Sequence, residues 1–444
     1  MIETGAIHIC VGTKPTGRLA LALSNTRTAA AAQLLAAPEN RSRARRLVTL
    51  LFGLCPIAQL VAFDTARAAA CGCPAPVERT ARLAEIAVVL EAIVETIRVF
   101  VAEAGQISGI FHTREAGKRI GRLRVRLTGL TETILLLDPC APAAPEDRER
   151  LRAGFASAKA LLEEALDIAK TEIYGTSPDA FDLEHNTLDA LKAWAREASP
   201  FRAAARLFAA ELDRPRGDCE IEISFLPVRS DKTTPAFAEE LLNRMLFESG
   251  FELAPFWQGS PRLTGTLSRM RDAHPAARAL IDERGISPAS LLGCRLLELA
   301  VALRHAKRLL ALSKSAADGS AEAGAGPKRA YLNSVVWSLA ESEGRHREAI
   351  SLVETARGLL AHAVRLDSDG SVSTLRITSP TEWQFAPYGA GQRMLISLVR
   401  SRFAESLPTS KREIESVVRQ ALFGLDPCVP LEFAYTGEAA RLAP

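Results

Sequence analysis

Residues 51–59 read LFGLCPIAQ and lie at the centre of a longer run, residues 47–63, that contains no charged side chain. A helix that crosses a membrane needs about 20 consecutive apolar residues, and this run is shorter. Gly53, Pro56 and Gln59 also interrupt it. The stretch is therefore predicted to be part of a buried core, and it carries one cysteine, Cys55.

Outward from this stretch, alanine, leucine and arginine are frequent, and these residues favour helix. The clearest helix follows Pro76, where apolar side chains recur at three- and four-residue spacing from Leu83 to Val101 and form one stripe. Further helices are predicted over residues 145–171, 184–209, 234–248 and 287–313. The sequence thus predicts a mainly α protein with a core of long helices.

Short strands are predicted at both ends of the chain. Residues 6–11 and 18–23 flank the turn GTKPTG and form a hairpin within residues 1–25. Residues 360–366 and 372–377 flank DSDG and form a second hairpin before the C-terminal motif. Residues 219–226 alternate polar and apolar side chains and are also expected to be a strand. Residues 313–329, rich in alanine, glycine and serine, are expected to be a flexible loop.

Charge and cysteine content narrow the class of protein. The 55 basic and 52 acidic side chains leave a net charge of only +3, which does not favour a nucleic-acid partner. The eight cysteines are scattered and form no disulfide framework. The first residues do not resemble a signal peptide. We expect a cytoplasmic protein with reduced thiols and no membrane partner.

Three more segments stand out beside residues 51–59. Residues 353–362 read VETARGLLAH and include Arg357. Residues 379–385 read SPTEWQF and include Thr381, and residues 425–431 read LDPCVPL and include Cys428. Each segment alone is weak evidence. The tripeptide Asp-Pro-Cys of the last segment, for example, also occurs at residues 138–140. Their order along the chain is the informative feature.

Taken together, the four segments resemble the large subunit of nickel–iron hydrogenases. That family has Arg-x-Cys-Gly-x-Cys-Pro near its N-terminus, then Glu-x-Pro-Arg-Gly, then Pro-Ser/Thr-Thr-Trp-Asn, and finally Asp-Pro-Cys-x-x-Cys. The resemblance is clearest over residues 46–105 and 350–434. It implies one large-subunit-like domain spanning residues 1–444.

The departures from the family concern its metal ligands. In the family, four thiolates hold nickel, and two of them bridge to an iron that carries cyanide and carbon monoxide. Here Phe52 and Leu431 occupy two of the four positions, so that Cys55 and Cys428 alone remain. Nickel without two of its soft ligands is not expected to be held in the enzyme's geometry. The resemblance therefore implies a protein without hydrogenase activity and without catalytic residues.

The positions around the metal ligands are partly kept. The family's arginine and histidine are replaced by Leu50 and Gln59, and Ala434 replaces the residue of the C-terminal processing site, so we expect an unprocessed chain. Arg357 matches an arginine over the diatomic ligands of the iron, and Thr381 matches a hydroxyl residue that donates to a cyanide. Donors of this kind orient a metal unit.

This pattern is similar to the hydrogenase accessory proteins of the HupK/HoxV type. The resemblance implies a scaffold on which the Fe(CN)2CO unit is transiently bound through Cys55 and Cys428 before transfer. It also implies partners: a maturation chaperone, the cyanide-delivery proteins and the precursor of the hydrogenase large subunit.

Two other functions remain open at this point. The chain could be a metal-free interaction module that mimics the large subunit to engage maturation chaperones. It could also be an enzyme, either an active hydrogenase or a quinone-reducing relative like the respiratory complex I subunit. The first enzyme needs ligands that are missing, and the second has no need of the two thiolates that persist.

Cys71 and Cys73 form a rival site, because two thiolates one residue apart can chelate a metal or be redox-active. No second pair of cysteine or histidine residues lies nearby at zinc-binding spacing. We therefore expect these two to be structural or surface thiols. The remaining cysteines, Cys10, Cys140, Cys219 and Cys294, are expected to have no functional role.

Overall fold

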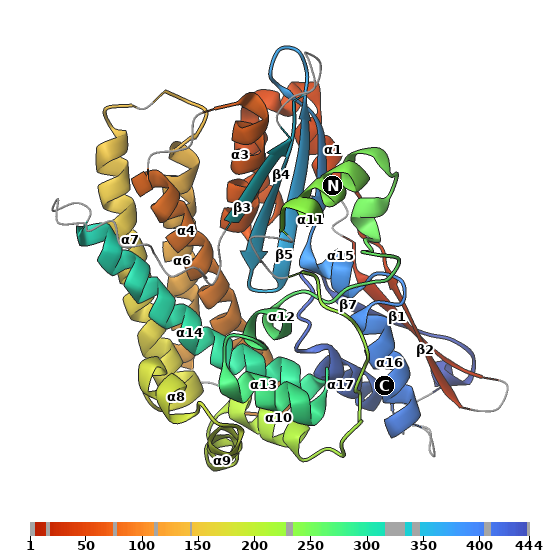
Figure 1. Cartoon of the computed structure of the whole chain (residues 1–444). Coiled ribbons are helices and arrows are strands. Elements are labelled where there is room, and N and C mark those ends of the chain that lie inside the picture. The colour runs from red at the N-terminus through yellow and green to blue at the C-terminus, as the bar shows by residue number, and fades with distance from the viewer. Residues whose placement is uncertain are drawn as a thin grey trace.

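Helices dominate the computed structural model, as the sequence predicts, and two small sheets complete it (Figure 1). No described helix combines the length and the apolar character that a bilayer-spanning segment requires. The structure describes residues 5–14, 18–73, 78–110, 114–142, 144–227, 234–315, 334–339, 347–403 and 410–441.

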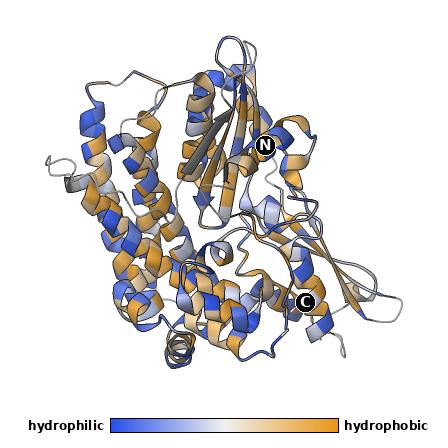
Figure 2. Cartoon of the chain, viewed as in Figure 1, coloured by the Kyte–Doolittle hydropathy of each residue, from blue (hydrophilic) through white to orange (hydrophobic). Residues whose placement is uncertain are grey.

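Four long helices form the helical body. The helix predicted after Pro76 is present as α4, and its stripe ends at Val101, just beyond the helix. Because other long helices pack around it, α4 is buried on all sides from Ile86 to Ile97 and not along one stripe alone (Figure 1). Along α6 and α7, hydrophobic and hydrophilic residues alternate in patches, as expected for helices with one face in solvent (Figure 2). The four helices are α4 (Glu78–Arg98), α6 (Arg114–Leu136), α7 (Asp147–Ile168) and α14 (Pro288–Ser315).

An antiparallel sheet lies between α3 (Pro56–Cys71) and α11 (Thr234–Phe247) (Figure 1). Its side chains alternate between the two helices: Ile350 and Leu352 pack in the cluster of α11, whereas the Ser351 hydroxyl lies 2.7 Å from that of Thr65 on α3. The hairpin predicted before the C-terminal motif is its last pair of strands. In spatial order the strands are β3 (Ser334–Leu339), β4 (Arg347–Thr355), β5 (Gly358–Leu366) and β6 (Val372–Thr378).

A second sheet joins the two ends of the described chain. The predicted N-terminal hairpin is present as β1 (Ile7–Thr13) and β2 (Leu19–Asn25). The strand β7 (Leu431–Tyr435) pairs with β1 in parallel, with Leu431 opposite Ile7 and Tyr435 opposite Val11. This pairing holds the segment around Cys428 beside the N-terminal hairpin.

Shorter helices connect these parts. They include α1 (Ala30–Ala36), α2 (Ala44–Leu51), α5 (Ala104–Ser108), α8 (Pro178–Glu184), α9 (Leu188–Ala198), α10 (Ala203–Leu212), α12 (Thr266–Met270), α13 (Pro275–Arg284), α15 (Pro380–Gln384), α16 (Ala390–Arg402) and α17 (Lys411–Leu422).

The single helix predicted over residues 184–209 is wrong. The chain there forms the end of α8, then α9 and α10. Thr187 caps α9 by accepting from the backbone N–H of Ala190, so a new helix begins where the prediction continued the old one. The break before α10 follows Ser199 and Pro200, and a proline is unfavourable in the interior of a helix.

Two further predictions concern residues 219–226 and 313–329. The strand predicted over residues 219–226 is absent; the segment makes only isolated bridges, from Ile221 to Ile286 and from Phe225 to Leu263, so it pairs with each neighbour at a single residue. Of the flexible loop predicted over residues 313–329, the first three residues end α14, and the others lie outside the described residues.

Candidate metal centre

Cys55 lies at the N-terminus of α3, after the short turn that follows α2. It is the N-cap residue, and Pro56 is the first residue of the helix, where its missing N–H costs no hydrogen bond. The next two N–H groups, of Ile57 and Ala58, donate to the Glu91 carboxylate on α4 at 2.7 and 2.9 Å. Glu91 thus caps the helix and fixes the position of Cys55.

The protein interior changes the ionisation of both groups. Burial raises the pKa of Glu91 to about 8, although the N–H groups of Ala58 and Ile57 act in the opposite direction. Burial also raises the pKa of the Cys55 thiol well above its ordinary value, and the negative charges of Glu91 and Cys428 add to this effect. The Cys55 thiol is therefore protonated near neutral pH, and a cation bound there would displace its proton.

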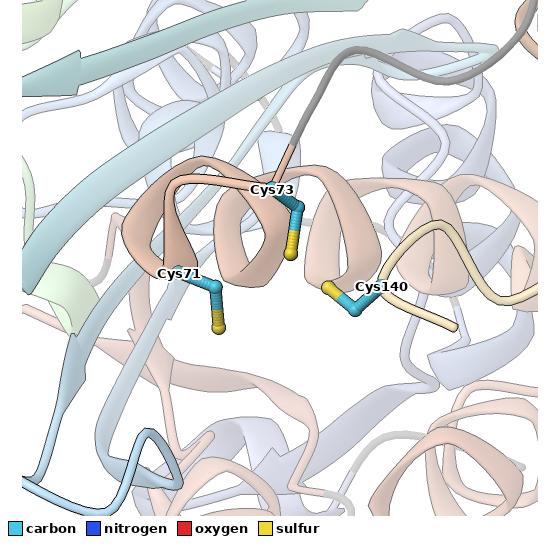
Figure 3. A group of neighbouring side chains, drawn as sticks. All are labelled: Cys71, Cys73 and Cys140. Atoms are coloured by element: carbon cyan, nitrogen blue, oxygen red, sulfur yellow. The ribbon is translucent and has the colours of Figure 1, made fainter. Parts of the chain in front are cut away.

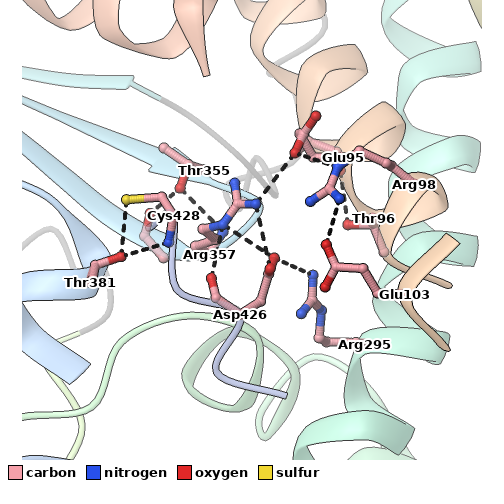
Figure 4. Close-up of polar contacts among 12 residues, drawn as sticks. Glu95, Thr96, Arg98, Glu103, Arg295, Thr355, Arg357, Thr381, Asp426 and Cys428 are labelled. Atoms are coloured by element: carbon pink, nitrogen blue, oxygen red, sulfur yellow. Dashed lines mark hydrogen bonds and ion pairs between the residues drawn. The ribbon is translucent and has the colours of Figure 1, made fainter. Parts of the chain in front are cut away.

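Cys428 lies between α17 and β7, and its sulfur accepts two hydrogen bonds. The Thr381 hydroxyl donates to Sγ at 3.2 Å and accepts from the backbone N–H of Cys428 at 3.2 Å (Figure 4). Arg27 Nη1 donates to the same sulfur at 2.8 Å. Burial lowers the pKa of Arg27, but the charges of Glu382 and Cys428 outweigh it and raise this pKa above its ordinary value.

The two cysteines line one cavity of about 590 Å³, although they come from opposite ends of the sequence. Its wall also includes Arg27, Arg357 and Phe52. The volume lies in the range of ordinary small-molecule sites, about 300–1,000 Å³. After burial and Glu91, an electrostatic interaction with Cys428 is among the causes of the raised pKa of Cys55, as expected for thiols that line one cavity. The cavity therefore offers two sulfur donors and two guanidinium groups to one ligand.

Arg357 is buried in the two-residue turn between β4 and β5. Its Nε donates to the backbone oxygen of Asp426 at 2.9 Å, and its Nη2 lies 3.3 Å from a Glu95 carboxylate oxygen (Figure 4). Within the described part of the chain, its Nη1 makes no hydrogen bond. This nitrogen is therefore available to an acceptor bound in the cavity that Arg357 lines.

The two positions that lack the family's cysteine differ in their surroundings. Phe52 follows the last residue of α2 and lines the cavity. Leu431 is the first residue of β7 and lines an adjoining cavity instead. Phenylalanine in the cavity wall thus occupies one ligand position, and a residue of the strand β7 occupies the other.

Gln59, at the position of the family's histidine, links Cys55 to the sheet. Its Nε2 lies 3.8 Å from the Cys55 sulfur, and its Oε1 lies 2.7 Å from Nε2 of His362 on β5. Since the amide oxygen accepts, His362 carries its proton on Nε2. Burial lowers the pKa of His362 to about 3, so the ring is neutral.

Thr381 contacts the site in a different way from the one that the resemblance implies. Its hydroxyl is engaged with Cys428, and the neighbouring Ser379 and Pro380 line the cavity. Its contact with a diatomic ligand therefore stays a prediction. What the structure shows is a residue that orients Cys428.

Arg27 is a site residue that the sequence analysis missed. It follows β2, belongs to none of the four motifs, and reaches Cys428 only because β1 pairs with β7. It also donates to Ser379 at 3.2 Å and pairs with Glu382 at 3.2 Å. No local sequence signal marks such a residue, since its role depends on the pairing of distant strands.

Two curated proteins are similar to this chain in sequence. The chain is 30% identical over 242 residues to the hydrogenase expression/formation protein HupK of Azotobacter vinelandii, a match covering 52% of this chain and 64% of that protein. It is 30% identical over 200 residues to the hydrogenase expression/formation protein HoxV of Cupriavidus necator, covering 44% of each chain. The resemblance to the HupK/HoxV type is thereby confirmed, over about half the length of these relatives. No family model matches the chain.

Solved structures confirm the fold. A chain of the Ni–Fe–Se hydrogenase from D. vulgaris Hildenborough superposes with a TM-score of 0.53 at 15% identity, and 94% of each chain is covered. A chain of an NAD+-reducing [NiFe]-hydrogenase gives a TM-score of 0.53 at 11% identity, also with 94% of each chain covered. At these identities the likeness establishes the large-subunit-like fold alone.

Proposed function

We propose that this chain is a hydrogenase maturation accessory protein that holds an Fe(CN)2CO unit and passes it on, without hydrogenase activity of its own. The observation that carries the proposal is the convergence of Cys55 and Cys428 on one cavity within a large-subunit-like fold. The unit is a cargo rather than a resident cofactor. The names of the similar proteins, hydrogenase expression/formation proteins, support a role in maturation.

The donors around the cavity fit such a cargo. Two thiolates are soft ligands suited to iron, and cyanide nitrogens are hydrogen-bond acceptors. Arg357 offers its Nη1, and Arg27 adds a guanidinium that contacts one of the sulfurs. Both arginines are already paired with carboxylates, so they supply N–H donors more than net positive charge.

Nickel and catalysis fit less well. The phenyl ring of Phe52 stands where a third thiolate is needed, and Leu431 belongs to β7. A site with two thiolates in place of four does not reproduce the ligand field that the family uses for nickel. We therefore expect no nickel and no hydrogen turnover.

Transfer of the cargo requires partners. We propose that the chain meets a small maturation chaperone and the cyanide-delivery proteins when it is loaded, and the precursor of the large subunit when it is emptied. Cys55 and Cys428 both line the cavity and neither residue is fully buried, so a partner that docks at the cavity could reach the site.

Infrared spectroscopy tests the proposal. Protein purified without oxygen from a hydrogenase-producing host should show cyanide and carbonyl stretching bands and contain iron. Cys55→Ala and Cys428→Ala should each lose the bands, because either change leaves only one thiolate. Cys10→Ala is the matched control. Cys10 is also partly accessible, but it lies on β1 and does not line the cavity, so this variant should keep the cyanide and carbonyl bands.

The alternative is a metal-free module that engages maturation chaperones. It predicts wild-type protein without iron or bands, and a Cys55→Ala/Cys428→Ala double variant that still supports hydrogenase assembly. That pair of results would replace the scaffold proposal.

A further inference from the structure

A second group of cysteines lies outside the cavity. The sulfur atoms of Cys71, Cys73 and Cys140 all lie within 4.8 Å of one another, and each side chain is half-buried (Figure 3). Within the described residues, no other set of three or more histidine, cysteine, aspartate or glutamate side chains meets this criterion. None of the three lines the cavity of Cys55 and Cys428.

The end of α3 places two of these sulfurs side by side. Cys71 is the last residue of the helix, and Gly72 follows in the left-handed conformation with φ of 66°. Glycine adopts this conformation without strain, and it turns the chain back on itself. The backbone N–H of Cys73 then donates to the oxygen of Ala68 at 2.9 Å. The turn thus carries Cys73 back toward the helix it has just left.

The third sulfur comes from the loop after α6. The backbone N–H of Cys140 donates to Oδ1 of Asp138 at 2.9 Å, which fixes the local turn. Asp138 is in turn paired with Arg67 of α3, one helical turn before Cys71. This ion pair ties the loop to the helix, so the approach of Cys140 to the other two thiols is built into both elements.

We propose that Cys71, Cys73 and Cys140 form a binding site for a thiophilic d10 cation, Zn²⁺, with three thiolate ligands and a fourth position open to solvent. Three sulfurs at the usual Zn–S distance of about 2.3 Å lie roughly 3.8–4.0 Å apart, so little contraction is needed. The site does not depend on the function proposed for the Cys55 cavity.

Charge supports this assignment. Zn²⁺ with three thiolates carries one net negative charge. Arg67 lies one helical turn before Cys71 and pairs with Asp138, two residues before Cys140, so a guanidinium lies near the three sulfurs. A monovalent d10 ion would leave a second negative charge.

A disulfide is the competing chemistry for these thiols. It would join two of the three sulfurs at about 2.05 Å and leave the third without a role. All three side chains are free thiols in the structure. A metal site accounts for the presence of the third cysteine, whereas a disulfide does not.

The test uses the full chain with Cys55→Ser and Cys428→Ser, so that the cavity cannot contribute. Reduced, metal-free protein is titrated with Zn²⁺ against a chromophoric chelator, and with Co²⁺ as an optical probe. We expect one equivalent of Zn²⁺ and an intense sulfur-to-cobalt charge-transfer band. Adding Cys73→Ser or Cys140→Ser removes a direct ligand and should weaken binding by more than the about 10- to 100-fold that loss of an outer-shell partner typically costs, and adding Cys10→Ser should not change it.

The variants must first be shown to keep the fold. Serine is nearly isosteric with cysteine, and equal thermal melts of the variants would show that the fold is kept. Unchanged Zn²⁺ affinity in the Cys140→Ser variant would overturn the site. The site would also be overturned by two results together: a thiol count that shows a disulfide between two of the three cysteines in the cell, and a titration in which the reduced protein does not bind Zn²⁺.

Discussion

At the scale of single residues, Glu91 decides how Cys55 is presented. It is one of the few carboxylates buried in the helical core, and its partners are backbone N–H groups at the start of α3 rather than a cation. Burial raises its pKa to about 8, whereas an unfolded chain leaves it near 4.5. The folded protein therefore binds one more proton than the unfolded chain between these two pH values.

This difference predicts a specific pH dependence. A raised carboxyl pKa contributes stability that is complete below about pH 4.5 and is lost as the pH rises through about 8, by up to about 1.4 kcal/mol per pH unit. Glu91→Gln should remove this slope, at a cost of about 1–3 kcal/mol for the acceptor that the amide cannot replace. Urea denaturation of wild type and variant at pH 5, 6, 7 and 8 measures it.

The control is Glu163→Gln, an exposed side chain on α7 that should keep the wild-type slope. Equal slopes for wild type and Glu91→Gln would show that Glu91 is ionised in the folded state.

At the scale of elements, the turn between β4 and β5 presents Arg357. The turn is held from several sides: Thr355 Oγ1 donates to the oxygen of Gly358 at 2.9 Å, and Gln384 Nε2 donates to the oxygen of Arg357 at 3.0 Å. Gly358 has φ of 134°, and a Cβ there would lie 2.7 Å from Thr264 Cγ2. The turn that presents Arg357 is thus packed closely against Thr264 and Gly265, with no room for a larger residue at position 358.

Gly358→Ala should therefore destabilise the protein. The backbone strain alone is worth roughly 1–3 kcal/mol, and the contact with Thr264 adds to it. Because the turn must shift to relieve the clash, infrared bands from a bound cyanide should also move or weaken. The midpoint of thermal unfolding and the infrared spectrum measure the two effects.

Gly129→Ala provides the comparison. Gly129 lies within α6, and a Cβ there meets no atom within 4 Å, so alanine should be neutral or stabilising by about 0.5–1 kcal/mol. A Gly358→Ala protein as stable as Gly129→Ala would mean that the turn is not as tightly constrained as the structure indicates.

At the scale of the whole molecule, one buried network joins segments that are far apart in the sequence. Asp426, two residues before Cys428, pairs with Arg357 of the β4–β5 turn at 3.2 Å and with Arg295 of α14 at 3.1 Å (Figure 4). Arg357 continues the network to Glu95 of α4. The helical body, the sheet and the C-terminal segment therefore meet at one carboxylate, whose pKa, despite burial, is held below its usual value by Arg357 and Arg295.

Asp426→Asn should loosen this junction. Removing one partner of a buried ion pair costs about 3–5 kcal/mol, because the remaining charges stay buried. Asparagine tolerates the left-handed backbone of this position, where φ is 45°, so the effect should come from charge and not from strain. We expect lower stability to urea and faster hydrogen exchange over residues 424–431.

The exposed pair of Arg46 and Glu132 is the reference for this change. Glu132→Gln should alter stability by no more than about 1 kcal/mol, since solvent screens a surface pair. If Asp426→Asn were as mild, the network would contribute little to the joining of the segments.

The sequence by itself determined the chemistry that can be read locally. The class of fold follows from helix-forming composition and periodicity, and the helix predicted from the residue spacing is present as α4. The presence of Cys55 and Cys428, and the loss of ligands at Phe52 and Leu431, are identities at motif positions and need no coordinates. The division of residues 184–209 was missed because caps such as Thr187 are weak signals within a helix-rich composition.

The tertiary structure decided which side chains meet. Arg27 reaches Cys428 through the parallel pairing of β1 with β7, and Cys140 reaches Cys71 and Cys73 because an ion pair ties a loop to α3. Both approaches join residues that are distant in the sequence, and each depends on packing between whole elements. Such packing produces no periodicity or spacing in the sequence. The partners of Cys428 and of Cys140 could therefore be recognised only in three dimensions.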